Sequence, residues 1–186
     1  QPQILQLNGQ LAADDPAAAA LRAGSAIGLL GIELHSRRRN RINGHVLTRT
    51  AGLLEIGVEH AFGNCPQYIQ HRDVQINTVD HQVARPEAQR RSGLDDAART
   101  MISQADTFFV ASYIEHADGS RSVDMSHRGG QAGFVRVDGD CLTIPDFAGN
   151  LHFNTLGNLL LNPRAGLLFI DFASGDLLQV SGRTEL

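Results

Sequence analysis

Hydrophobic and polar positions alternate over short stretches in the second half of the chain, a pattern that is typical of β-strands. The apolar run over residues 107–114 is rich in aromatic and β-branched side chains and predicts a buried strand. The Asp118-Gly119 pair that follows predicts a tight hairpin turn. Further strands are expected at residues 121–126, 132–137, 141–145, 165–173 and 177–184. Such a series of short strands predicts a small antiparallel barrel.

Two helices are expected in the same half of the chain. The spacing of leucines predicts a helix over residues 151–161, which Pro163 ends. Another helix is expected over residues 94–104, with Ser92 as its N-cap and acidic side chains, Asp95 among them, in its first turn.

The chain contains an internal similarity at an offset of 138 residues. Residues 28–36 lie over residues 166–174, and without a gap residues 42–44 lie over residues 180–182. Each unit reads strand, loop, short helix, strand, turn, strand. A period of this length predicts a duplicated domain rather than a solenoid, whose repeats are far shorter.

The region between the two units gives weaker signals. Residues 46–48 and 53–58 look like strands, and Asn64 is expected to cap a short helical turn. The polar, arginine-rich residues 80–93 predict a linker.

The composition is that of an ordinary globular protein, with 42% hydrophobic and 19% charged residues. A formal net charge of −4 argues against a protein that coats nucleic acid duplexes, so no nucleic acid partner is expected. Cys65 and Cys141 fit a reducing compartment, so we expect a cytoplasmic location. No segment reaches the roughly 18 uninterrupted apolar residues of a membrane span, so no membrane partner is expected.

Hydrogen-bonding side chains gather at residues 122–130 and 142–155, on strand ends and at a helix start. A phosphate dianion needs several N–H and O–H donors and a cation, and the start of a helix offers spare backbone donors. These segments therefore predict a cradle for a planar cofactor that carries a phosphate.

The same segments resemble the pyridoxamine 5′-phosphate oxidase-like FMN-binding split-barrel family, in its tandem form. A D-x-S-x-R-G-like motif occupies residues 124–129, and an I-P-D-x-x-G-N-like motif occupies residues 144–150. The run N-P-R-x-G-L-L-F occupies residues 162–169. Residues 28–41 and 62–69 look like the upstream half of the larger tandem members.

The resemblance implies a β-rich α+β fold, a split barrel of antiparallel strands with flanking helices, duplicated in degenerate form. Residues 1–79 would be an incomplete split-barrel-like half, residues 80–93 a linker and residues 94–186 the FMN-binding barrel. Family flavin sites form at a dimer interface, so the resemblance also implies a homodimer.

The resemblance implies FMN as cofactor and assigns roles to individual residues. Ser126 and Arg128 would contact the phosphate, and Asn150, Asn154 and Thr155 would donate to it. The isoalloxazine would lie along Asp124, Met125, Pro145 and Asp146, and Phe169, Gln179 or Arg183 of a second subunit would complete the pocket. The oxidase members hold phosphate with several basic residues, whereas Arg128 is the single cation expected here.

The implied function is that of an FMN-dependent oxidoreductase acting on an unidentified small molecule. The alternative is a protein that binds flavin or another phosphate-bearing ligand without turnover. A third hypothesis is a scaffold whose binding site has decayed. No catalytic acid or base stands out. His127 and His152 are expected to be exposed polar residues, and the alternative for His127, beside Arg128, is that it stabilises a flavin or substrate anion.

Two other clusters of polar residues are candidates for metal or anion binding. Glu59, His60, Cys65, His71 and His81 match no recognised metal-ligand spacing, so a loop with interspersed histidines is favoured and no metal is expected. The arginine-rich residues 37–41 are expected on a hairpin turn and a strand start, with alternate arginines in solvent or in salt bridges. An anion site shared with the arginine-rich linker is the alternative for this run.

Overall fold

The computed structural model describes residues 3–11, 15–73, 88–149 and 153–186. The first half contains β1 (Ile4–Asn8), α1 (Pro16–Ala20), β2 (Ala26–Glu33), β3 (Arg38–Arg49) and β4 (Leu53–Asn64). The second half contains α2 (Asp96–Gln104), β5 (Thr107–Glu115), β6 (Arg121–Gly129), β7 (Arg136–Asp138), β8 (Cys141–Thr143), α3 (Asn154–Leu161), β9 (Arg164–Ile170) and β10 (Leu177–Arg183).

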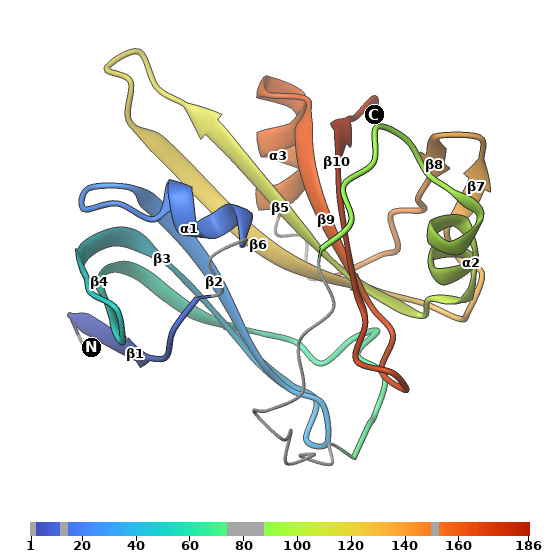
Figure 1. Ribbon diagram of the computed structural model, residues 1–186, viewed down its shortest axis with the longest axis horizontal. Helices are drawn as coiled ribbons and strands as arrows, with labels where there is room; N and C mark the ends of the chain where they lie inside the picture. Colours follow the sequence, from blue (N-terminus) through green and yellow to red (C-terminus); the bar gives the residue numbers. More distant parts are fainter. Residues whose placement is uncertain (1–2, 12–14, 74–87, 150–152) are drawn as a thin grey trace.

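The strands form two four-stranded sheets and one small hairpin, all antiparallel (Figure 1). The first sheet has the order β1-β4-β3-β2, the second has the order β10-β9-β5-β6, and β7 pairs with β8. Neither four-stranded sheet closes on itself within the described residues. The protein is therefore a β-rich α+β protein. No helix in the described part of the chain is long and apolar enough to span a membrane.

The hairpins β2–β3 and β9–β10 have the same register at the offset found in the sequence. Gly28 pairs with Asn43 in the first hairpin, and Gly166 pairs with Ser181 in the second. Each residue of the second pair lies 138 positions after its counterpart in the first. The similarity between the two units thus extends from residue identity to strand pairing.

The main core lies on one face of the second sheet. Phe108, Val110, Ala165 and Phe169 point into it from β5 and β9. Ile102 of α2 and Leu159 of α3 cover this face. A smaller cluster of Ile27, Val46 and Ile56 lies in the first sheet. The two sheets meet where β2 and β3 pack against β6, an edge strand of the second sheet.

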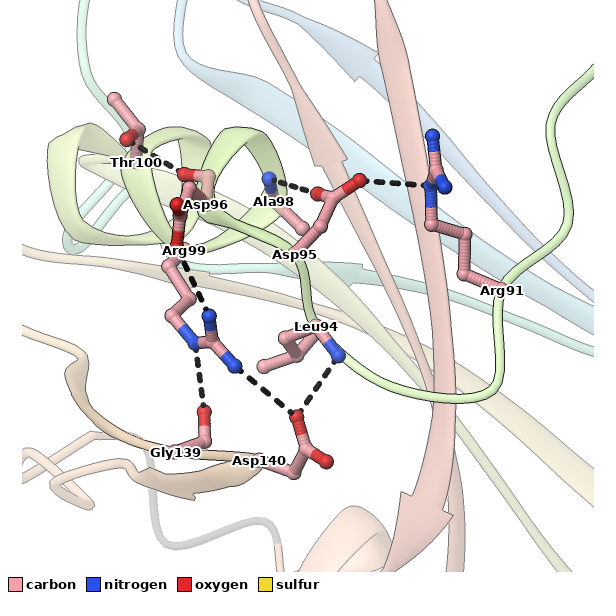
Figure 2. Close-up of polar contacts among 9 residues, drawn as sticks. All are labelled: Arg91, Leu94, Asp95, Asp96, Ala98, Arg99, Thr100, Gly139 and Asp140. Atoms are coloured by element: carbon pink, nitrogen blue, oxygen red, sulfur yellow. Dashed lines mark hydrogen bonds and ion pairs between the residues drawn. The ribbon is translucent and has the colours of Figure 1, made fainter.

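Helix α2 is tied to the β7–β8 hairpin at one end of the molecule (Figure 1). The Asp95 carboxylate accepts a hydrogen bond from the Ala98 amide at 2.9 Å and is the N-cap, so the prediction of Ser92 was wrong. Asp140, in the β7–β8 turn, accepts from the Leu94 amide at 2.9 Å (Figure 2). An Asp side chain reaches the N3 amide from the N-cap position itself, and Ser92 lies too far upstream to do so.

Several predicted boundaries were wrong. Strand β6 continues to Gly129 rather than stopping at residue 126, so Arg128 lies in a strand. Strand β7 is limited to Arg136–Asp138, because residues 131–133 form a turn in which Gly133 has a φ of 87°. In the first half, β3 and β4 are far longer than the predicted segments.

The polar ends of β3 and β4 explain why these strands were underestimated. The arginine run over residues 37–41 was expected on a hairpin turn and only the start of a strand, whereas Arg39 and Arg41 both lie within the long strand β3. Asn64 is the last residue of β4 rather than a cap. Residues 80–87 of the predicted linker lie outside the described residues, and residues 88–91 form neither helix nor strand.

Candidate functional site

A buried ion pair joins the two halves of the protein. The Nη1 atom of Arg41 lies 3.1 and 3.0 Å from the two carboxylate oxygens of Asp124, and its Nη2 atom donates to Ser126 Oγ at 2.5 Å. Thr155 Oγ1 donates to Asp124 at 3.3 Å. All four side chains are buried. We call these four residues the Arg41 network. Three of them, Asp124, Ser126 and Thr155, are predicted cofactor residues, but here they bond to Arg41 and to one another.

Strand geometry places these groups. Successive side chains of a strand point to opposite faces, so Asp124 and Ser126 of β6 share one face and Arg39 and Arg41 of β3 share another. Because β3 packs against β6, the basic face of one strand meets the polar face of the other.

A small pocket lies beside the network, with a volume of about 60 Å³. Its lining includes Arg39 and Arg41 from β3, His127 and Arg128 from β6, and the loop that carries Pro145 and Asp146. We call it the β3–β6 pocket. Its volume exceeds the roughly 10–15 Å³ that one water needs and is far below the roughly 300 Å³ of a typical ligand site. It therefore suits one compact group rather than a whole cofactor.

His127 is a neutral donor in the wall of this pocket. Its Nδ1 atom lies 3.3 Å from Nη1 of Arg39. Arginine has only donors, so Nδ1 accepts and the imidazole proton is on Nε2. Burial, followed by the charges of Arg39 and Arg128, lowers the pKa of His127 from 6.5 to about 4. The expectation of an exposed His127 was wrong, since only 3% of the residue is exposed.

Three donor atoms on side chains that line the pocket lack a partner in the described part of the chain. Buried Nε of Arg39, Nε of Arg41 and Nε2 of His127 have no hydrogen-bond acceptor among the described residues. Each such group costs about 1–3 kcal/mol when it is left unsatisfied. All three belong to side chains that line the same pocket, but the three atoms themselves are fully buried, so a ligand in the pocket would bond to them only after these side chains move.

The charges are also unbalanced. Arg41 is paired with Asp124, and Arg128 Nη2 lies 3.8 Å from Asp146. No carboxylate in the described ranges lies within ion-pair distance of Arg39. Burial, followed by the charge of Arg41, lowers the pKa of Arg39. An anion in the pocket would relieve this repulsion.

The segment after β4 covers the pocket. Tyr68 has a φ of 64°, an uncommon conformation for a residue with a side chain. Its hydroxyl donates to the Ala148 carbonyl at 2.7 Å, and its ring centroid lies 5.4 Å from that of Phe147. A Cβ on Gly129 would overlap the Tyr68 carbonyl oxygen, so the close approach of this segment requires glycine at position 129.

The predicted cofactor residues separate into groups. Arg128, Pro145 and Asp146 line the β3–β6 pocket, while Met125 and Asp124 line a separate groove. Asn154 begins α3 and is exposed. Phe169 is fully buried in the core, 5.2 Å from the ring of Phe108. Asn150 lies outside the described residues.

The sequence offered Arg39 and Arg41 as part of an anion site only as an alternative, with the arginine-rich linker rather than β6 as the other side of the site. The signal was the arginine run read in strand register: Arg38 is exposed as expected, whereas Arg39 is half-buried and Arg41 is buried. Tyr68 carried no signal, because its contact with Ala148 joins residues 80 positions apart.

The histidine and cysteine cluster of the first half forms no metal centre in the described part of the chain. Glu59 interacts with His45, 3.2 Å from its Nδ1 atom, rather than with His60 or Cys65. His81 lies outside the described residues. Cys65 and Cys141 are both free thiols.

Comparison with family models, with characterised proteins and with solved structures finds no match to this chain.

Proposed function

We propose that the protein binds FMN, with the phosphate in the β3–β6 pocket, and acts as an FMN-dependent oxidoreductase on a small molecule. The observation that carries the proposal is the convergence of Arg39, Arg41 and His127 on one small pocket. A phosphate would supply acceptor oxygens for these side chains and a negative charge for Arg39, which has no carboxylate partner among the described residues. Arg128, which the sequence resemblance assigns to the phosphate, lines the same pocket.

The size of the pocket indicates which residues would contact the phosphate and which would contact the isoalloxazine. A volume of about 60 Å³ suits the phosphate group alone. The isoalloxazine would then lie at the mouth, beside Pro145, Asp146 and the rings of Tyr68 and Phe147. Bound FMN would supply the electron chemistry, so the chain's own task is to bind and orient it. The Arg41 network would hold Arg41 in place while Arg39 and His127 donate.

The resemblance extends the proposal to architecture and assembly. We propose that the second half is a split barrel and that the first half is its degenerate copy, and the shared hairpin register at Gly28 and Gly166 supports a duplication. A cytoplasmic homodimer with the cofactor at its interface is part of the same proposal.

The test is a comparison of FMN with riboflavin, which lacks the phosphate. Both are titrated into the apoprotein and followed by flavin absorbance and fluorescence. FMN should bind more tightly, because charge-assisted hydrogen bonds contribute about 1.5–3 kcal/mol each. Arg39→Gln should weaken FMN binding by roughly 10- to 100-fold, the equivalent of one such bond, and leave riboflavin binding unchanged.

Arg38→Gln is the matched control, since Arg38 precedes Arg39 on the same strand and is exposed. It should leave both affinities unchanged. Equal affinities for FMN and riboflavin would refute the phosphate site.

Turnover is tested separately. Reduced nicotinamide should bleach the bound flavin, and air should restore the colour. A yellow protein that is neither bleached nor reoxidised would be a flavin carrier, which is the alternative function.

A further inference from the structure

The second sheet presents an outer face that is remote from the core. Ala165, Leu167 and Phe169 of β9 point toward the core, so Arg164, Gly166 and Leu168 point the other way. A groove of about 570 Å³ lies on this outer face. We call it the outer-face groove. Its volume falls within the roughly 300–1,000 Å³ of small-molecule sites.

The floor of the groove is flat because its side chains are small. Ser181 pairs with Gly166, Gly166 with Ala111, and Ala111 with Met125 across four neighbouring strands. Gly28 of β2 borders the groove where it meets β6. No side chain longer than a hydroxymethyl group stands on the strip between Ser181 and Ala111, so a planar molecule could lie along it.

One end of the groove carries two arginines in direct opposition. Arg164 and Arg183 are a cross-strand pair of β9 and β10, and both are exposed. Like charges in this position repel each other. No carboxylate in the described residues forms an ion pair with either guanidinium. Asp124 borders the groove, but its oxygens are occupied by Arg41 and Thr155.

Tyr113 adds a hydroxyl to the same end of the groove. A hydrogen bond from the Asn162 side chain and the guanidinium of Arg164 lower the pKa of this hydroxyl, against the opposite effect of burial. The end of the groove is therefore a positive environment with an O–H donor beside it.

We infer that the outer-face groove is a second ligand site, which takes a flat organic molecule with one oxyanion, a carboxylate or a phosphate, on the Arg164–Arg183 pair. The Arg41–Asp124 pair separates this groove from the β3–β6 pocket, since Arg41 lines the pocket and Asp124 lines the groove. The inference does not depend on FMN binding in the pocket.

The test is calorimetric titration of the full chain with benzoate and with phenyl phosphate, and benzyl alcohol serves as the neutral control. Both anions should bind and benzyl alcohol should not. Arg183→Gln should weaken both anions at least tenfold, and Arg39→Gln, which alters the pocket, should leave benzoate affinity unchanged. No binding of either anion, or a loss caused by Arg39→Gln rather than Arg183→Gln, would overturn the inference.

A spectroscopic measurement locates the bound ligand without substitution of either arginine. The chain has two tyrosines and no tryptophan. Tyr113 lines the groove and Tyr68 lines the pocket, so Tyr68→Phe leaves Tyr113 as the single phenol. Bound benzoate should raise the pKa of Tyr113, measured by phenolate absorbance, because a nearby anion disfavours the phenolate.

The reciprocal variant Tyr113→Phe should abolish the benzoate-dependent change in absorbance. A change that persists in this variant, where Tyr68 is the remaining tyrosine, would place the ligand in the pocket and overturn the inference, whether or not FMN binds there.

Discussion

Removing the charge of Arg41 should destabilise the whole protein, because its ion pair with Asp124 is buried and joins the two halves. The side chains are only 6% and 3% exposed. Arg41→Met keeps an unbranched but shorter side chain without a charge, and leaves Thr155 as the remaining side-chain donor to the Asp124 carboxylate among the described residues. Removing one partner of a buried pair costs about 3–5 kcal/mol of the free energy of unfolding. We expect a loss in that range.

Urea unfolding at neutral pH, followed by circular dichroism, measures this loss. Asp124→Asn should also destabilise, and the double variant should lose less than the sum of the two single variants. The difference, a coupling energy of about 2 kcal/mol, isolates the pair itself. Arg38→Met is the control on the same strand and should change stability by less than about 0.5 kcal/mol. A loss below about 1 kcal/mol for Arg41→Met, or full additivity, would refute the reasoning.

Three further predictions concern single features of the fold. The depressed pKa of His127 means that the unfolded chain binds a proton that the folded chain does not between pH 6.5 and about 4. The free energy of unfolding should therefore decrease by about 1.4 kcal/mol for each unit by which the pH is lowered in that window. The variant His127→Gln should remove this slope from urea midpoints measured at pH 7 and pH 5. Gly129→Ala should cost about 1–3 kcal/mol by forcing Tyr68 away, whereas Gly31→Ala, where a Cβ meets nothing within 4 Å, should be neutral or stabilising in the same urea assay. Asp95→Ala should lower stability by about 1 kcal/mol through loss of the α2 cap, and an equal loss for Ser92→Ala in thermal unfolding would contradict that assignment.

Much of the fold of the second half could be predicted from local sequence. Residues 107–114 and 177–184 coincide closely with β5 and β10, because alternating apolar positions and the Asp118-Gly119 turn are local signals. The internal similarity also has a structural counterpart in the register of the two hairpins. The long strands β3 and β4 were harder, because their polar side chains resemble a solvated loop until their partners are known.

The candidate site was predictable only in part. Arg128, Pro145 and Asp146 do line one pocket, but the sequence contained no indication that Arg39 and Arg41 meet them. The alternation along a strand predicts which side chains share a face, but it does not predict which other element that face packs against. Arg41 finds Asp124 at a separation of 83 residues, a distance over which no local periodicity carries information.

The sequence by itself determined the β-rich class, most strand positions in the second half, and the alternation that separates Arg38 from Arg39 and Arg41. Tertiary structure decided that the inward arginines meet β6, that His127 is buried with a donor that has no partner among the described residues, and that Ser126 and Thr155 are occupied by the Arg41 network. The physical reason is that strand propensity and turn chemistry act between near neighbours, whereas burial and charge pairing depend on which distant segments pack together.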